Sequence, residues 1–149
     1  MGLDVVAFSN AWPIESEDPD LGYHVYSVNG IDRMDGKPEG RYCGENEFSF
    51  RAGSYGGYNE FRSWLSKTFI GAEPKIVWES SVLYCDKPFY ELVNFGDNEG
   101  AFGPATSAKL AADFAAHAAP ICEEYYARTY GLFKKAFEIA SDDGFVVFC

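Results

Sequence analysis

The hydrophobic pattern changes its period between residues 47 and 71, and this change constrains the fold more than any other feature. In residues 47–52 (EFSFRA) phenylalanines alternate with polar residues, which is typical of a half-buried β-strand. From Tyr58 to Phe69 the apolar residues recur at helical spacing, and Gly71 stands where a helix would end. The sequence therefore predicts a strand that passes through the glycine-rich loop GSYGG into a helix.

A second junction of the same kind is predicted at residues 89–114. Residues 89–95 resemble a strand, and a glycine-rich acidic loop follows at residues 96–104. Thr106 or Ser107 is the expected N-cap of a helix that extends to Ala118. Loops between strands and helices are common places for functional sites, so both junctions are candidates.

The remaining segments complete a mixed pattern of strands and helices. Strands are expected at residues 3–9, 23–28 (before an Asn-Gly turn) and 145–149, loops at 10–20 and 31–44, and a helix from Pro120 to a stop at 141–144. Residues 75–84 fit either a short helix or a strand. The order β-β-β-α-β-α-α-β predicts a single α+β domain, residues 1–149, with a largely antiparallel sheet and helices packed on one face.

The charge and the cysteines restrict the function. A formal net charge of −11 argues against binding to nucleic acids or to anionic membranes, which need clustered basic residues. The four cysteines contain no CxxC pair, and with two histidines they reproduce no zinc spacing, so neither a metal nor a cofactor is expected. Without a signal-peptide pattern or a long apolar stretch, we expect a cytoplasmic protein with reduced thiols.

The first junction contains a weak catalytic motif and a softer binding motif. Residues 52–56 (AGSYG) resemble the G-x-S-x-G turn of serine hydrolases, with Ala52 in place of the first glycine. A hydrolase would need His117 as its base and a larger sheet, so glycines that permit a tight turn are the simpler explanation. Alternatively, helix N-terminal amides beside Arg51 and Arg62 could hold an anion or a carboxylate.

The second junction places Asp97 and Glu99 in the loop at residues 96–104. With a distant acid such as Asp113, these carboxylates could hold a hard cation, but the spacing of a calcium loop is not met. The structural alternative is that the acids cap turns and face the positive end of the following helix.

The two junctions together resemble a group of small uncharacterised proteins from bacteria and phages. The shared segments are FRAGSYxGYN, which covers residues 50–59 here, and ELxxFxDxEGxxGP followed by KLxxDF, at residues 91–114. The resemblance implies a microbial or viral intracellular setting and no particular activity. It marks Arg51, Ser54, Tyr58, Asn59, Asp97, Glu99, Gly100, Lys109 and Asp113 as the matching positions.

Two functional hypotheses follow, and the lack of a complete catalytic set favours the first. The first is a small acidic binding protein of the immunity or anti-defence type, which recognises a basic protein partner. Its candidate contacts are Glu15, Glu17, Asp18 and Asp20. The alternative is a small-ligand site or hydrolytic enzyme at the two loops, residues 51–62 and 95–104. Its candidate residues are Arg51, Ser54, Tyr55, Tyr58, Asn59, Arg62, Asp97 and Glu99. Convergence of the loops on one pocket would favour the alternative.

Overall fold

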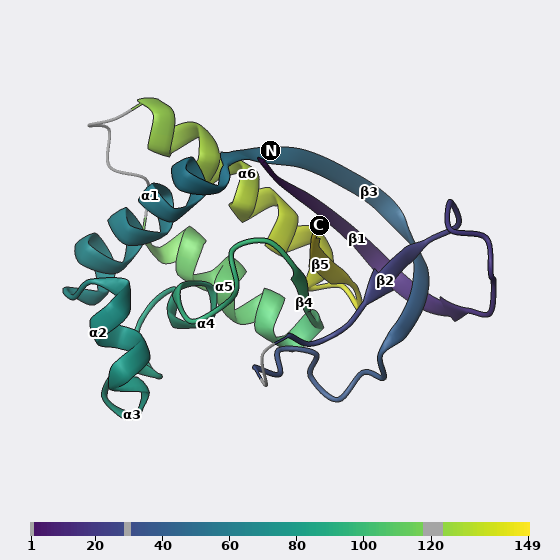
Figure 1. Ribbon diagram of the computed structural model, residues 1–149, viewed down its shortest axis with the longest axis horizontal. Helices are drawn as coiled ribbons and strands as arrows, with labels where there is room; N and C mark the ends of the chain where they lie inside the picture. The colour runs from purple at the N-terminus through teal and green to yellow at the C-terminus, as the bar shows by residue number, and fades with distance from the viewer. Residues whose placement is uncertain (1, 29–30, 118–123) are drawn as a thin grey trace.

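The sheet is antiparallel and places the first strand at its centre (Figure 1). The computed structural model describes residues 2–28, 31–117 and 124–149. Its strand order is β2-β3-β1-β5-β4, so β1 pairs with both β3 and β5. The strands are β1 (Gly2–Ile14), β2 (Tyr23–Val25), β3 (Gly40–Ser54), β4 (Gly100–Phe102) and β5 (Phe145–Phe148). The predicted α+β class with a largely antiparallel sheet is confirmed.

Helices gather against one face of this sheet (Figure 1). The longest, α6, packs across β1, β3 and β5, and α5 lies beside it. The helices are α1 (Tyr55–Leu65), extended by a π-helical turn η1 (Ser66–Ile70), α2 (Pro74–Glu79), α3 (Ser81–Tyr84), α4 (Tyr90–Val93), α5 (Pro104–Ala116) and α6 (Glu124–Ala140).

Strand β1 is buried on both faces, which explains its continuous apolar run. Leu3, Val5 and Ala7 belong to the large core under the helices, whereas Val6 and Phe8 belong to a second cluster on the other face. Met34 and residues of β2, β3, β4 and β5 complete that second cluster. Met34, which lies between β2 and β3, therefore helps to cover the face that the helices leave open.

The predicted strand at residues 89–95 is wrong, and the fourth strand is β4 instead. Residues 90–93 form the single turn of α4, and Phe89 before it has a left-handed backbone with φ 63°. Phe89, Leu92, Val93 and Phe95 are all buried. A short run buried on every side has the same apolar pattern in a helix and in a strand, so the sequence could not separate them.

Several predicted boundaries also differ. Strand β3 begins at Gly40, inside the predicted loop 31–44, and β1 continues to Ile14 through an irregularity at Asn10, which has positive φ. Strand β2 ends at Val25, earlier than predicted. Bulges let a strand continue through residues that interrupt its alternation, so the pattern underestimates its length.

The caps of the helices depend on the tertiary structure. Gly103 is the N-cap of α5, with Pro104 in the first turn, so the predicted cap at Thr106 or Ser107 is wrong. The carboxylate of Asp35 instead accepts bonds from the Thr106 amide (2.8 Å) and hydroxyl (2.9 Å). The helix stop at Gly71 is confirmed, with φ 89°. The ambiguous residues 75–84 are helical in α2 and α3, whereas the Asn-Gly turn and Pro120 lie outside the described residues.

Candidate functional site

The two predicted loop regions meet in space at Asn59 and Asp97. Asn59 lies in α1, and its Nδ2 donates a hydrogen bond to the Asp97 carboxylate over 3.1 Å. One turn along the helix, Arg62 donates from Nη1 to the carbonyl oxygen of Phe95 and from Nη2 to Oδ1 of Asn59, each at 2.5 Å. The segment at residues 94–97 is therefore held against the side of α1.

Arg62 is the central residue of this site because its charge is buried without a counter-ion in the described part of the chain. Only 6% of the residue is exposed, and its guanidinium lies 5.7 Å from the ring centre of Tyr58 and 5.2 Å from that of Trp78. Neither Arg62 nor Asp97 takes part in an ion pair among the described residues. Burying a charge this way is costly, so the neighbouring carbonyl, amide and rings must offset the loss of water.

The amide of Asn59 separates the positive group from the negative one. Its oxygen accepts from Arg62, and its nitrogen donates to Asp97. Each charge is thereby fixed in place, yet each keeps hydrogen-bonding capacity because a guanidinium has five N–H groups and a carboxylate has about four acceptor positions.

Two neighbouring grooves open on this arrangement. One has a volume of about 380 Å³ and is lined by Ile31, Arg62, Trp78, Asn94, Phe95, Gly96 and Asp97. The other, of about 420 Å³, is lined by Asn59, Arg62, Ser63, Glu73, Pro74, Lys75, Trp78 and Asp97. Both include Arg62, Trp78 and Asp97, so these three side chains form the shared wall. The volumes lie within the range of about 300–1,000 Å³ that is usual for ligand pockets.

Trp78 supplies an apolar surface beside the two charges. It lies in α2 and is 45% exposed, while its indole N–H donates to the carbonyl oxygen of Val93 over 2.8 Å. The hydrogen bond fixes the ring, so its exposed part can contact a ligand without losing much conformational freedom. Sequence reasoning missed Trp78 because residues 75–84 had no clear period.

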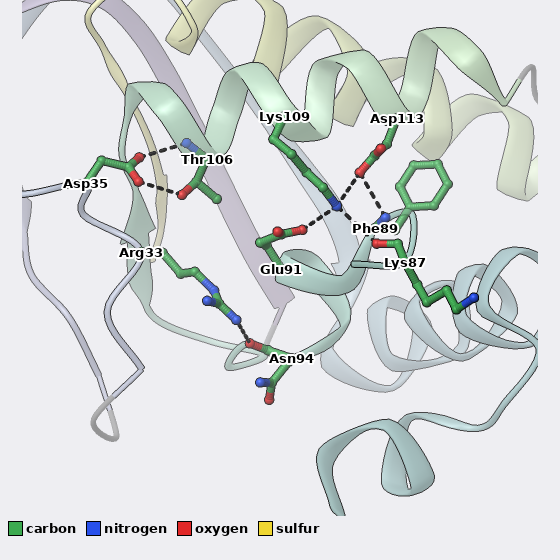
Figure 2. A network of polar contacts seen from close by, with 9 residues as sticks. All are labelled: Arg33, Asp35, Lys87, Phe89, Glu91, Asn94, Thr106, Lys109 and Asp113. Carbon is green, nitrogen blue, oxygen red and sulfur yellow. Dashed lines mark hydrogen bonds and ion pairs between the residues drawn. The ribbon is translucent and has the colours of Figure 1, made fainter. Parts of the chain in front are cut away.

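The backbone of the groove is also held from the loop between β2 and β3. Arg33 donates from Nη2 to the carbonyl oxygen of Asn94 over 3.2 Å (Figure 2). Its guanidinium also lies 5.5 Å from the ring centre of Tyr90. Two arginines, Arg33 and Arg62, therefore bind consecutive carbonyl groups at Asn94 and Phe95. Asn94 and Arg33 had not been singled out from the sequence.

A second polar network holds α4 against α5 (Figure 2). Lys109 donates from Nζ to Glu91 (2.6 Å), to Asp113 (2.7 Å) and to the carbonyl oxygen of Lys87 (3.0 Å). Asp113 also accepts from the amide of Phe89 over 3.0 Å, which stabilises the left-handed backbone there. These groups satisfy one another, so this network is structural.

The burial of Tyr58 makes it an apolar support for Arg62. The residue is completely buried, its hydroxyl has no hydrogen-bond partner among the described residues, and burial raises the pKa of this hydroxyl. The phenol therefore remains neutral, and its ring face is the part that Arg62 contacts.

Four of the candidate residues lie away from the grooves. Arg51 pairs with Asp4, which lowers the pKa of that carboxyl, and Ser54 accepts from the amide of Gly57 as the N-cap of α1. Glu99 accepts from the Tyr26 hydroxyl over 2.8 Å, and Tyr55 packs at the edge of the core. These positions have structural partners, so the site is smaller than the sequence suggested.

The hydrolase and cation interpretations are not supported by the geometry. Ser54 serves as a cap, and His117 packs against Phe69 and Phe89 at the end of α5, so the two do not form a nucleophile–base pair. In the described part of the chain, no three His, Cys, Asp or Glu side chains are grouped as metal ligands. Cys43, Cys85 and Cys149 are free thiols, and Cys122 lies outside the described residues.

The acidic run lies at the end of the sheet opposite to α2 and α3 (Figure 1). Glu15, Glu17, Asp18 and Asp20 are exposed, and none of them forms an ion pair within the described ranges. Arg41 shapes this loop by donating to the carbonyl oxygens of Pro19 (2.9 Å) and Leu21 (3.2 Å).

Comparisons with known proteins found no matching family model, no matching curated protein and no matching solved structure. Among the described residues, no helix has the length and apolar character needed to cross a membrane.

Proposed function

We propose that the chain is a binding protein whose grooves take a small zwitterionic ligand, of the kind represented by a free amino acid. The observation that carries this proposal is the buried guanidinium of Arg62, which faces both grooves and pairs with no carboxylate of the described residues. A ligand carboxylate would supply the missing counter-ion through N–H groups that the protein leaves unused.

Asp97 is the reason for proposing a zwitterionic ligand rather than a ligand that carries only a carboxylate. Its carboxylate lines the same grooves, accepts one hydrogen bond from Asn59 and has no cationic partner among the described residues. A ligand with only a negative charge would meet this carboxylate at short range, which is unfavourable. A ligand with an ammonium group and a carboxylate can satisfy both side chains, and its apolar part can cover Trp78.

Binding of free amino acids tests this function directly. The 15N-labelled protein is titrated with individual α-amino acids, and the indole resonance of Trp78 is followed. We expect at least one amino acid to shift this resonance saturably, because its side chain lies against the ring. The corresponding acids without an amino group and the amines without a carboxylate should bind far more weakly.

Two matched substitutions, each of which removes one negative charge, complete the test. Asp97→Asn keeps the shape and the bond from Asn59, and should weaken binding roughly ten- to hundredfold because one charged hydrogen bond is lost. Asp4→Asn is the control, since the Asp4 side chain is 49% exposed and pairs with Arg51 away from the grooves. Equal affinity of both variants, or no shift with any amino acid, would refute the proposal.

A second function is supported at the acidic end of the sheet, namely recognition of a basic protein partner, as an immunity or anti-defence protein would do. The specific observation is that exposed carboxylates, unpaired among the described residues, lie with two exposed apolar residues, Trp12 (46% exposed) and Leu21 (47%). Such a combination provides electrostatic attraction and apolar contact area together.

Charge reversal tests this second function. In Glu15→Lys/Glu17→Lys/Asp20→Lys, Asp18 is retained because its carboxylate accepts from the Asp20 amide and shapes the turn. Affinity capture from the source cells should lose a partner with this variant and retain it with the exposed control set Glu79→Lys/Asp86→Lys/Asp142→Lys. A partner lost equally from both variants would indicate dependence on net charge alone and contradict a site at this end.

A further inference from the structure

The outer edge of β3 lacks a neighbouring strand over most of its length. The strand spans Gly40–Ser54, but β2 pairs with it only at residues 40–42. In the parts of the chain that the structure describes, no strand pairs with this edge beyond Tyr42. Figure 1 shows β3 running along the margin of the sheet. An unpaired edge presents N–H and C=O groups that can bind another strand.

Two irregularities define the part of the edge that can pair regularly. Asn46 has φ 54° and Gly53 has φ 102°, and the register with β1 shifts on both sides of the segment between them. From Phe48 to Arg51 the pairing with β1 is regular, with Phe48 opposite Ala7 and Arg51 opposite Asp4. Residues 48–51 therefore form a short and regular edge, and Glu47 adjoins it beside the irregularity at Asn46.

The side chains of this segment have a self-complementary order. Glu47, Ser49 and Arg51 are exposed on one face, and the half-buried Phe48 and Phe50 lie on the face toward the helices. Glu47 and Arg51 are placed symmetrically about Ser49. In an antiparallel pair of two identical segments centred on Ser49, each Glu47 faces Arg51 of the other copy, and each Phe48 faces Phe50.

We propose that two copies of this chain associate through β3, antiparallel and with a two-fold axis at Ser49, to form one continuous sheet. The charges favour a second copy because the segment carries one acid and one base in mirror order, so the same surface complements itself. Glu47 and Arg51 both keep hydrogen-bonding atoms that can form this contact. Glu47 uses Oε2 for the Tyr23 hydroxyl (3.2 Å), and Arg51 uses Nε and Nη2 for Asp4, so Oε1 and Nη1 face no partner among these bonds.

The association surface is separate from the grooves at Arg62 and does not depend on the proposed ligand. It extends the sheet on the side of β3, whereas the grooves lie between α1, α2 and residues 94–97. The large negative charge of each copy opposes association, so the proposal predicts a dimer that forms reversibly with concentration rather than a permanent one.

A pair of charge variants tests the two-fold geometry. In a dimer of the Glu47→Arg variant, an arginine at position 47 of each copy faces Arg51 of the other. In a dimer of the Arg51→Glu variant, Glu47 of each copy faces a glutamate at position 51 of the other. An equimolar mixture of the two variants places only arginines of one copy against glutamates of the other. Sedimentation velocity over a wide concentration range should show wild-type dimerisation, roughly ten- to hundredfold weaker self-association of each variant, and recovery in the mixture.

The controls separate edge pairing from other causes. Glu79→Arg and Lys75→Glu make the same kinds of charge change at exposed positions on α2 and should leave dimerisation near the wild-type level. Circular dichroism verifies that each variant is folded, which is expected because the pair between Arg51 and Asp4 is exposed. A wild-type protein that stays monomeric at millimolar concentration, or a mixture no stronger than its components, would overturn the proposal.

Discussion

The hydroxyl group of Tyr130 links α6 to the C-terminal end of α5. It donates to the carbonyl oxygen of Phe114 over 2.7 Å and is also bonded to that of His117. Only 3% of the residue is exposed, and burial raises the pKa of this hydroxyl to about 12. Burial acts in the same direction on Tyr58. Both phenols are therefore neutral donors or apolar rings throughout the physiological range.

From the raised pKa values of these tyrosines we predict that the folded protein loses stability at alkaline pH. For Tyr130, whose folded-state pKa lies above the unfolded value, this contribution to stability is complete below about pH 10 and is lost as the pH rises through about 12. The free energy of unfolding should fall by up to about 1.4 kcal/mol per pH unit for each tyrosine in that window. Denaturant unfolding at several pH values measures this slope. Tyr130→Phe should be less stable at neutral pH yet show a shallower slope, and an unchanged slope would contradict the assignment.

At the scale of elements, the short helix α4 depends on the Lys109 network. Glu91 and Asp113 are only 18% and 17% exposed at their side chains, so removal of Lys109 leaves two carboxylates with little water near each other. We predict that Lys109→Met lowers the free energy of unfolding by about 1–3 kcal/mol. The control is Lys134→Met, whose exposed pair with Glu138 should cost at most about 0.5 kcal/mol. Equal costs in the two variants would show that the network adds nothing.

The elements that the sequence predicted well are those with a sustained period. The strand around residues 47–52, the helix that follows it, and the last helix and strand are all present. The strand predicted at residues 89–95 was wrong because their conformation depends on a distant side chain, since Asp113 holds the amide of Phe89. A run this short, with most of its residues buried, also gives no clear period. The predicted cap of α5 was wrong for the same reason, because Asp35, in another part of the chain, accepts from the first-turn amide of Thr106.

At the scale of the whole molecule, the sequence led to the hypothesis that the two loop regions meet, but it did not identify the residues that make the contact. Asn59, Arg62 and Asp97 were among the candidates, whereas their neighbours Arg51 and Glu99 belong to other contacts. The choice among adjacent residues depends on which side of α1 and β3 each one occupies after packing. Trp78, which lines both grooves with Arg62 and Asp97, lies on a short helix that only the tertiary structure identifies.

The central place of β1 has a consequence for how the protein is made. The first strand leaves the ribosome long before β5, yet it is enclosed only when both β3 and β5 are beside it. During synthesis, Val5, Val6 and Phe8 therefore stay available to other chains and to chaperones until β5 has emerged. Pairing between such distant parts of a chain also slows folding. Newly made molecules are thus most vulnerable to aggregation before β5 has emerged and paired with β1.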